Sequence, residues 1–555
     1  MGETPGNGET PHVTRRTLLG GAAAVGAATL IGPAAGLAEA RQGSRLVSSR
    51  WIGSLSGTSA AILAPGRFVL AGVEWSAPPR ATIELRARAP SGSWSHWVPA
   101  SVLGHDADGA NRRAGLFGEP AWTGVADAVQ VRSNRLVDGV RVHFVALGAQ
   151  AVRATSVRAL ATPVLDAGPG QPPILAREAW AGGQARPVHA PTYGTIDLAF
   201  VHHTVNPNGY SAAEVPALLV SIFNYHVHVR GFWDIAYNFI IDLYGGIWEG
   251  RAGGIDMPVI GAHAGAYNAE STGVAVLGDF MNVVPSAAAI ASLERLLAWK
   301  LSLHGVPTEG RATVVVDPKS AYYTPFPPGA HVSLPRIAGH RDGDSTDCPG
   351  NAFYGQLPAI RPRVTSLAGT AARITAGTPR ARLTGGGTVT VSGRLALLSG
   401  APIAGALVEF QQLRGVGTPA TLATTQTAVD GSWSVPVTVT EDALVRGLHR
   451  SHPAAVSDWL DLAVAPAITL AVASIAPLRV TGTISPAKRR ATVALYPARR
   501  TTGKPIASKL VRVVAGNFAA GFASVRPGNY VLIARSAADQ LNAAGASAHV
   551  PVTIS

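Results

Sequence analysis

The period of the hydrophobic pattern changes twice along this chain of 555 residues, and these changes restrict the folds that it can adopt. Between residues 45 and 163 apolar and polar side chains alternate one by one, for example at 83–88 and 140–145. Such alternation predicts strands with one buried face. Residues 174–364 mix strand-like with helix-like runs, and alternation returns near residue 370. The pattern therefore predicts an α/β domain between two β regions.

The middle region, residues 174–364, is predicted to contain a mixed β-sheet flanked by helices. Two stretches, 213–227 and 286–304, carry apolar side chains at steps of three and four residues, which is typical of amphipathic helices. Three short apolar runs have the composition of buried strands: residues 198–201, 237–241 and 273–277. The alternation of the two kinds of run indicates an α/β fold.

The β regions on either side are predicted to be β-sandwiches. The first covers residues 45–163, and a linker rich in Pro and Gly follows at 166–173. In the C-terminal region two short sequences recur: 388–393 resembles 478–482, and 430–433 resembles 515–518. The repetition predicts two tandem immunoglobulin-like sandwiches, residues 370–473 and 474–555.

The N-terminal segment, residues 1–40, is predicted to be a signal peptide rather than part of the fold. Arg15 and Arg16 precede an apolar stretch rich in Ala and Gly, and Ala38 and Ala40 fit the small-x-small cleavage rule. The paired arginines predict export by the twin-arginine (Tat) pathway to the cell envelope or the exterior. After cleavage, no apolar run long enough to cross a membrane remains, so we expect no transmembrane anchor.

Positive charge gathers at the C-terminal end of the chain. The net charge is +13, and residues 366–555 contribute 18 basic and 7 acidic residues, a balance of +11. Lys488, Arg489 and Arg490 form one cluster, and Arg499 and Arg500 form another. This balance favours an anionic partner or serves solubility. Nucleic acid is not expected, because the chain is predicted to be exported and its basic clusters lack interleaved aromatic residues.

The histidines and the single cysteine concentrate in the middle region. Nine of the sixteen histidines and Cys348 lie between residues 174 and 364. His202 and His203 end a predicted strand, and His340 precedes Cys348 by eight residues. Two imidazoles and a thiolate suit zinc and leave a fourth position for water. Spacing alone also allows His202 and His203 to be an ordinary strand end and Cys348 to be a small buried hydrophobe.

Several ordered motifs in residues 174–361 resemble the family of peptidoglycan recognition proteins and type-2 N-acetylmuramoyl-L-alanine amidases. The motifs that carry the resemblance are at residues 200–204, 225–231, 233–242, 245–251, 261–268, 273–278, 339–342 and 348–350. They follow one another over nearly 200 residues, so chance similarity is a poor explanation. The resemblance implies an amidase fold and peptidoglycan as the partner.

The resemblance also implies a set of site residues. Zn²⁺ is expected to be held by His202, His340 and Cys348, a set that non-catalytic members usually lack because they have no cysteine. Binding to zinc also gives the lone thiol of an exported protein a purpose. Tyr237 corresponds to the family tyrosine whose hydroxyl stabilises the reacting centre. Thr346 lies where members carry Lys or Thr, and it can offer only a neutral hydrogen bond.

Two further histidines, His226 and His263, match positions that line the substrate groove of the family, although each also fits a structural role. His203 is expected to face away from the metal and to orient its neighbour. Residues 307–335 depart from the family pattern and are interpreted as an insertion over the groove.

The implied reaction is zinc-assisted hydrolysis of the amide bond between N-acetylmuramic acid and L-alanine of peptidoglycan. The main alternative is a recognition protein that binds peptidoglycan without cutting it. A thiol hydrolase that uses Cys348 with His340 as its base is a second alternative. In a third, the sandwiches carry a structural role in the cell wall. The C-terminal sandwiches are interpreted as spacers or as a site for anionic wall polymers.

Overall fold

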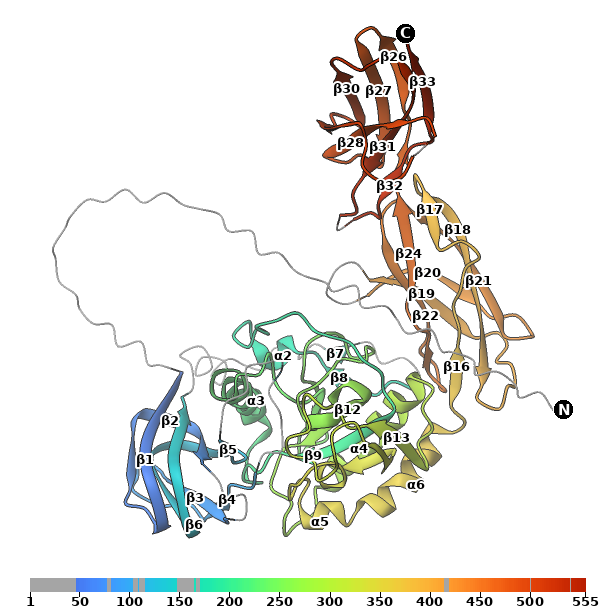
Figure 1. Ribbon diagram of the computed structural model, residues 1–555. Helices are drawn as coiled ribbons and strands as arrows, with labels where there is room; N and C mark the ends of the chain where they lie inside the picture. The colour runs from blue at the N-terminus through green and yellow to red at the C-terminus, as the bar shows by residue number, and fades with distance from the viewer. Residues whose placement is uncertain are drawn as a thin grey trace, which may run out of the picture. The chain divides into compact units, whose positions relative to one another are not determined.

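A computed structural model describes residues 46–76, 81–102, 108, 115–146, 164–165, 170–413, 419–499, 501–539 and 541–555 (Figure 1). The predicted signal peptide, residues 1–40, lies outside this described part. Among the described residues no helix combines the length and the apolar character needed to cross a membrane.

The N-terminal domain consists of β-strands around one hydrophobic core. Its strands are β1 (Val47–Thr58), β2 (Ile62–Trp75), β3 (Ile83–Arg88), β4 (Val98–Pro99), β5 (Leu116–Phe117) and β6 (Ala121–Val145). They form a single six-stranded sheet in the order β4-β3-β6-β2-β5, with β1 also paired to β6. The sequence predicted a sandwich of two sheets. Gly124 and Gly139 adopt φ angles of 62° and 66° in β6, so this 25-residue strand can bend and join both sides of the core.

The central domain contains the mixed sheet that the sequence predicted. Its strands, in spatial order, are β15 (Ile337–Gly339), β9 (Leu198–His203), β12 (Ser271–Val276), β10 (Phe239–Ile241), β11 (Ile247–Glu249), β8 (Ile174–Leu175) and β7 (Val164–Leu165). The first four strands run parallel, and β11 is antiparallel to β10.

Helices cover both faces of this sheet. They are α2 (Glu178–Ala181), α3 (Val215–Asn224), α4 (Ala287–Leu303), α5 (Asn351–Tyr354) and α6 (Leu357–Ala368), with short helical turns η1 (Ala212–Glu214), η2 (Tyr225–Arg230), η3 (Gly265–Glu270) and η4 (His340–Asp342). The predicted helix at 286–304 is confirmed as α4, and Ser286 caps it by accepting a hydrogen bond from Ala289 N (3.1 Å). Residues 213–227 divide between η1, α3 and η2.

Alternation along the strands explains the layered core. Ile240 and Ala275 pack in one hydrophobic cluster with α3, whereas Phe239 and Val274 pack on the other side with α4 and α6. Successive side chains of a strand point to opposite faces, so each strand contributes to both clusters. The carboxyl ends of β9 and β15 therefore lie at one edge of a rigid, fully covered sheet.

Residues 307–335, interpreted above as an insertion over the groove, contain a β-hairpin, and their assignment as an insertion stays a prediction. Strands β13 (Arg311–Val315) and β14 (His331–Pro335) pair antiparallel. Tyr323, in the loop between them, is buried and packs with the core of the N-terminal domain. This segment thus links the central domain to its N-terminal neighbour.

The C-terminal region has four further sheets. In the first half, a three-stranded sheet contains β16 (Ala372–Ile374), β18 (Gly387–Leu397) and β21 (Ser432–Val439), and a six-stranded sheet contains β17 (Arg382–Thr384), β19 (Leu407–Leu413), β20 (Ala420–Gln426), β22 (Ala443–His449), β23 (Ala455–Val456) and β24 (Leu460–Ala465). In the second half, a four-stranded sheet contains β25 (Ala467–Ile468), β26 (Ala471–Ile475), β27 (Leu478–Ser485) and β30 (Asn517–Phe522), and a five-stranded sheet contains β28 (Arg490–Pro497), β29 (Ala507–Arg512), β31 (Gly528–Ser536), β32 (Gly545–Ala546) and β33 (Val550–Ile554).

The two halves repeat one cross-strand pair. Gly393 of β18 lies opposite Trp433 of β21, and Gly482 of β27 lies opposite Phe518 of β30. In both pairs the aromatic ring covers the glycine, where a Cβ atom has no room. These are the segments whose sequences recur, so the repetition has a structural counterpart. The assignment of the two halves as immunoglobulin-like stays a prediction.

The basic clusters of the C-terminal region are not equally accessible. Lys488 is buried and forms an ion pair with Asp539 (2.7 Å), whereas Arg489, Arg490 and Arg499 are exposed. Arg500 lies outside the described residues. Lys488 is thus unavailable to a wall polymer, and binding of such polymers stays a prediction that rests on the arginines.

Candidate metal centre

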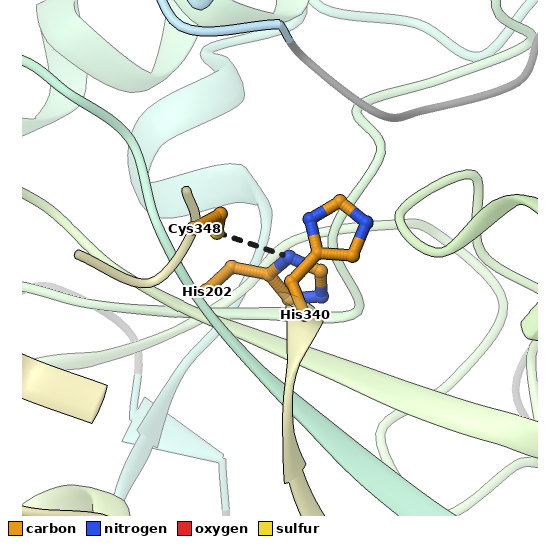
Figure 2. Close-up of side chains that lie close together, drawn as sticks. All are labelled: His202, His340 and Cys348. Atoms are coloured by element: carbon orange, nitrogen blue, oxygen red, sulfur yellow. Dashed lines mark hydrogen bonds between the residues drawn. The ribbon is translucent and has the colours of Figure 1, made fainter. Parts of the chain in front are cut away.

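The three predicted ligands meet at the carboxyl edge of the central sheet. His202 is the fifth residue of β9, and His340 follows directly after β15, which pairs with β9 in parallel. Cys348 is on the loop that follows η4. One ligand atom from each residue lies within 4.8 Å of the other two (Figure 2). The parallel register thus brings together side chains that are almost 140 residues apart in the sequence.

Neighbouring polar groups orient both imidazoles. Nε2 of His340 lies 3.1 Å from Oδ2 of Asp344, and Nε2 of His202 lies 3.2 Å from Nδ1 of His263. Nδ1 of His202 faces Sγ of Cys348 at 3.7 Å, the contact dashed in Figure 2. Partners of this kind fix the ring orientation and tautomer of metal-binding histidines.

The Cys348 thiol is fully enclosed, with 1% of the residue exposed. Burial raises its pKa well above the usual value, and the Glu119 charge adds to this. The backbone N–H of His203 donates to Sγ (3.4 Å) and acts in the opposite direction, toward the thiolate. If Cys348 served only as a small buried hydrophobic residue, contacts of its sulfur with an imidazole and a backbone N–H would not be needed. Two imidazoles and one thiol in this arrangement fit a zinc ion, whose charge would stabilise the thiolate.

Tyr237 lies beside the ligand cluster, just before β10. Its ring centroid is 5.4 Å from that of His202, and the residue is 1% exposed. Burial raises the pKa of its hydroxyl well above 10, and the charges of Glu119 and Cys348 raise it further. The phenol therefore stays protonated at neutral pH and is available as a hydrogen-bond donor.

Thr346 has a different position from that of Tyr237. Its hydroxyl donates to the carbonyl of Val102 in the N-terminal domain (3.1 Å) and accepts from the backbone N–H of Cys348 (3.2 Å). The hydroxyl proton is thus used in a hydrogen bond to the N-terminal domain. The catalytic role of Thr346 stays a prediction.

The two histidines expected in the substrate groove are both buried. His226 accepts a hydrogen bond from Ala236 N (3.1 Å) and stacks on Phe232, and burial lowers its pKa to about 3. His263 contacts His202, and burial lowers its pKa well below the usual value. Both rings are therefore neutral. Their part in substrate binding stays a prediction, and the structure brings only His263 to the ligand cluster.

His203 points away from the cluster, and its Nδ1 accepts from Phe280 N (3.4 Å). Its side chain therefore does not orient His202, and its backbone N–H is the group that reaches Cys348.

Sequence reasoning missed two acidic residues at this site. Asp344 is fully buried against His340, and its position four residues later in the same loop was a usable signal. Glu119 comes from the N-terminal domain, is 1% exposed, and influences the pKa of both Cys348 and Tyr237. No local pattern in the sequence connects it to residues more than 80 positions away.

A family model described as N-acetylmuramoyl-L-alanine amidase matches residues 192–351. This part of the central domain is thus similar to that family. The resemblance predicted from the motifs is thus confirmed, and the match supports a peptidoglycan amidase or peptidoglycan-binding domain as the general kind of function. A second model, described as Rv3811 N-terminal galactose-binding domain-like, matches residues 44–159.

Curated relatives resemble the amidase domain. Peptidoglycan-recognition protein 1 of Holotrichia diomphalia is 31% identical over 132 residues, which are 24% of this chain and 64% of that protein. Peptidoglycan-recognition protein SC2 of Drosophila melanogaster is 28% identical over 184 residues, 33% of this chain and 84% of the relative. The match to protein 1 thus spans less than two thirds of that relative.

Solved structures resemble the same domain. Wild-type Drosophila PGRP-LB is 25% identical and has a TM-score of 0.26, covering 34% of this chain and 92% of its own. The N-acetylmuramoyl-L-alanine amidase LysCS from Clostridium intestinale is 20% identical with a TM-score of 0.26, covering 36% and 99%.

Proposed function

We propose that the protein is a zinc-dependent hydrolase that cleaves the amide bond between N-acetylmuramic acid and L-alanine of peptidoglycan. The observation that carries this proposal is the cluster of His202, His340 and Cys348, whose ligand atoms lie within 4.8 Å in an amidase-family domain. These residues would hold the zinc. When bound, zinc supplies a Lewis acid for the scissile carbonyl and lowers the pKa of a bound water molecule.

The surrounding residues of this chain have distinct tasks in the proposed reaction. Asp344 and His263 hold the two imidazoles in place, and the His203 N–H favours the thiolate form of Cys348. Tyr237 donates its O–H to the oxygen that gains negative charge in the tetrahedral intermediate. A neutral donor suits this task, because the raised pKa of Tyr237 keeps its proton in place.

We further propose that the protein acts outside the cytoplasm. The paired arginines and the cleavage pattern of residues 1–40 support Tat export. Peptidoglycan is located in the compartment to which such a signal leads, so the predicted export signal is consistent with the proposed substrate.

The test is digestion of purified peptidoglycan by the chain without residues 1–40, with mass spectrometry of the products. We expect stem peptides with a free L-alanine amine. The products should disappear with a chelator, return with added zinc, and be absent with Cys348→Ala. His331→Ala is the matched control, because His331 is exposed on β14 outside the cluster.

The alternative is a recognition protein that binds peptidoglycan without cutting it. This alternative is supported by the curated relatives, which are named peptidoglycan-recognition proteins. Zinc-replete protein that sediments with peptidoglycan and releases no peptide would support it, provided that the site has been opened as described below. Chelator-resistant cleavage would instead point to Cys348 as a nucleophile.

A further inference from the structure

The N-terminal domain packs directly against the candidate metal centre. Tyr225 donates its hydroxyl proton to the Gly118 carbonyl (3.2 Å), and the Arg230 guanidinium lies 4.1 Å from the centroid of the Phe117 ring. Phe117 belongs to the same hydrophobic cluster as Tyr237 and α3. Residues 115–120, which we call the cover segment, are therefore part of the central core as well as of their own domain.

Two polar contacts fasten the same face at other points. Asp108 and Arg251 form a buried ion pair (2.6 Å), and Asp108 also accepts from Trp233 N (2.9 Å). The hydrogen bond from Thr346 to Val102 joins the cysteine-bearing loop to the N-terminal domain. The N-terminal domain thus contacts both the loop that carries Cys348 and the segments that carry Trp233 and Arg251.

The metal centre is sealed in this arrangement. His202 and His340 are 0% exposed, and Cys348 and Tyr237 are 1% exposed. Peptidoglycan is a polymer, and its amide carbonyl must come within bonding distance of the metal and of the Tyr237 hydroxyl. In this arrangement a carbonyl group of the proposed substrate cannot reach these buried side chains.

Glu119, in the cover segment, is a buried carboxylate without full compensation. Its Oε1 has no hydrogen-bond partner among the described residues. Burial raises the pKa of this carboxyl group well above its usual value, and the charge of Arg230 opposes the shift. Burial of this kind favours the neutral form of the acid.

We propose that the N-terminal domain is a built-in cover of the metal centre and that peptidoglycan reaches the site only after this cover opens. The inference rests on the proposed function for the nature of the substrate.

One glycine offers a way to open the cover without touching the site. Gly72, in β2, lies against Tyr225, and a Cβ atom added there would overlap the tyrosine ring. Gly66, in the same strand, has open space around its Cβ position. Neither glycine has a left-handed backbone, so alanine fits both local conformations. Gly72→Ala thus acts as a wedge between the domains, and Gly66→Ala is its matched control.

Cys348 is the only cysteine of the chain, so its reactivity reports on the cover directly. In zinc-free protein we would follow modification by dithiobis(nitrobenzoate). Gly72→Ala should react roughly tenfold faster than wild type or more, because the reactivity of a buried group follows the population of opened molecules. Gly66→Ala should match wild type. In zinc-loaded protein, Gly72→Ala should release zinc faster to a colorimetric chelator and cleave peptidoglycan faster.

A second variant protects the test against misfolding. Asp108→Asn breaks the ion pair to Arg251 at a separate point of the interface and should also accelerate modification of Cys348. Thermal unfolding of each variant identifies those that have lost the fold.

The outcomes separate the two proposals. Equal Cys348 reactivity in wild type, folded Gly72→Ala and folded Asp108→Asn would overturn the cover. Faster thiol modification without peptide release from zinc-loaded Gly72→Ala would leave the cover standing and remove the proposed amidase function. Peptide release at the same rate from all variants would leave the proposed amidase function standing and overturn the cover.

Discussion

The N-terminal and C-terminal regions attach to the central domain by the same physical device but differ in what they touch. Each uses a buried ion pair: Asp108 with Arg251 (2.6 Å) on one side, and Arg446 with Asp256 (2.5 Å) on the other. The N-terminal attachment reaches the metal centre through Thr346 and the cover segment. The contacts of Arg446 with the central domain are instead to Asp256 and Met257.

The difference teaches that a buried charge pair alone does not indicate control over a site. What distinguishes the N-terminal region is that its residues share a hydrophobic cluster with Tyr237, whereas Leu448 and Ala454 of the C-terminal region share one with α4 and α6. The C-terminal attachment includes Lys300, which is buried and donates to the carbonyls of Ile255 and Met257. We therefore expect perturbation there to change stability and leave the metal centre unaffected.

The largest effect is expected from Arg446→Met, which tests whether the two attachments act independently. It leaves Asp256 buried without its cation, and loss of one partner of a buried pair costs about 3–5 kcal/mol. Unfolding by denaturant measures this loss. Arg450→Met is the matched control, since Arg450 pairs with Glu409 (2.7 Å) nearer the surface and should cost about 0–1 kcal/mol. If Arg446→Met also accelerates modification of Cys348, the two attachments are coupled after all.

The next effect is expected inside the metal centre. Tyr237→Phe removes the proposed oxyanion donor and should lower kcat about 100- to 1,000-fold, because such donors contribute on that scale. Zinc content and Cys348 reactivity should stay at wild-type values, since the ring and its packing remain. Equal turnover by Tyr237→Phe and wild type would exclude the hydroxyl from the chemistry.

The candidate ligands and Tyr237 could be selected from the sequence because each lies in a short motif. His202 and His340 lie at the ends of strands, Tyr237 lies just before β10, and Cys348 lies on the loop after η4. The strands fix their relative positions, as the register of β9 and β15 does for His202 and His340. Glu119 was not predictable. Its influence on the pKa of Cys348 and of Tyr237 depends on the packing of one domain on another, which leaves no periodic or motif signal in residues 115–120. The prediction that Lys488 forms part of an accessible basic cluster was wrong for a similar reason, because its burial against Asp539 is a tertiary effect.

A smaller change is expected from Asp344→Asn, which tests orientation of a metal ligand. The amide keeps the size of the side chain but changes its hydrogen bond to Nε2 of His340 (3.1 Å). Loss of such a partner weakens metal binding about 10- to 100-fold. Competition with a chelator of known zinc affinity measures this change directly. Unaltered zinc affinity would show that His340 is held by the fold alone.

The smallest effect concerns Lys300 at the C-terminal attachment, and it depends on pH. Burial lowers the pKa of Lys300 to about 7, with Asp256 opposing this shift. The unfolded chain binds this proton below a pH of about 10.4. The folded chain binds this proton only below a pH of about 7. The free energy of unfolding therefore falls as the pH drops from about 10 to about 7 and then levels off.

Lys300→Met removes this titration, so its stability should vary less steeply with pH in that window, by at most about 1.4 kcal/mol per pH unit. Thermal midpoints measured between pH 7 and 9.5 provide the comparison with wild type. Parallel profiles would show that the lysine keeps its ordinary pKa. Because the effect belongs to the C-terminal attachment, the reactivity of Cys348 should differ between the two proteins at no pH in this range.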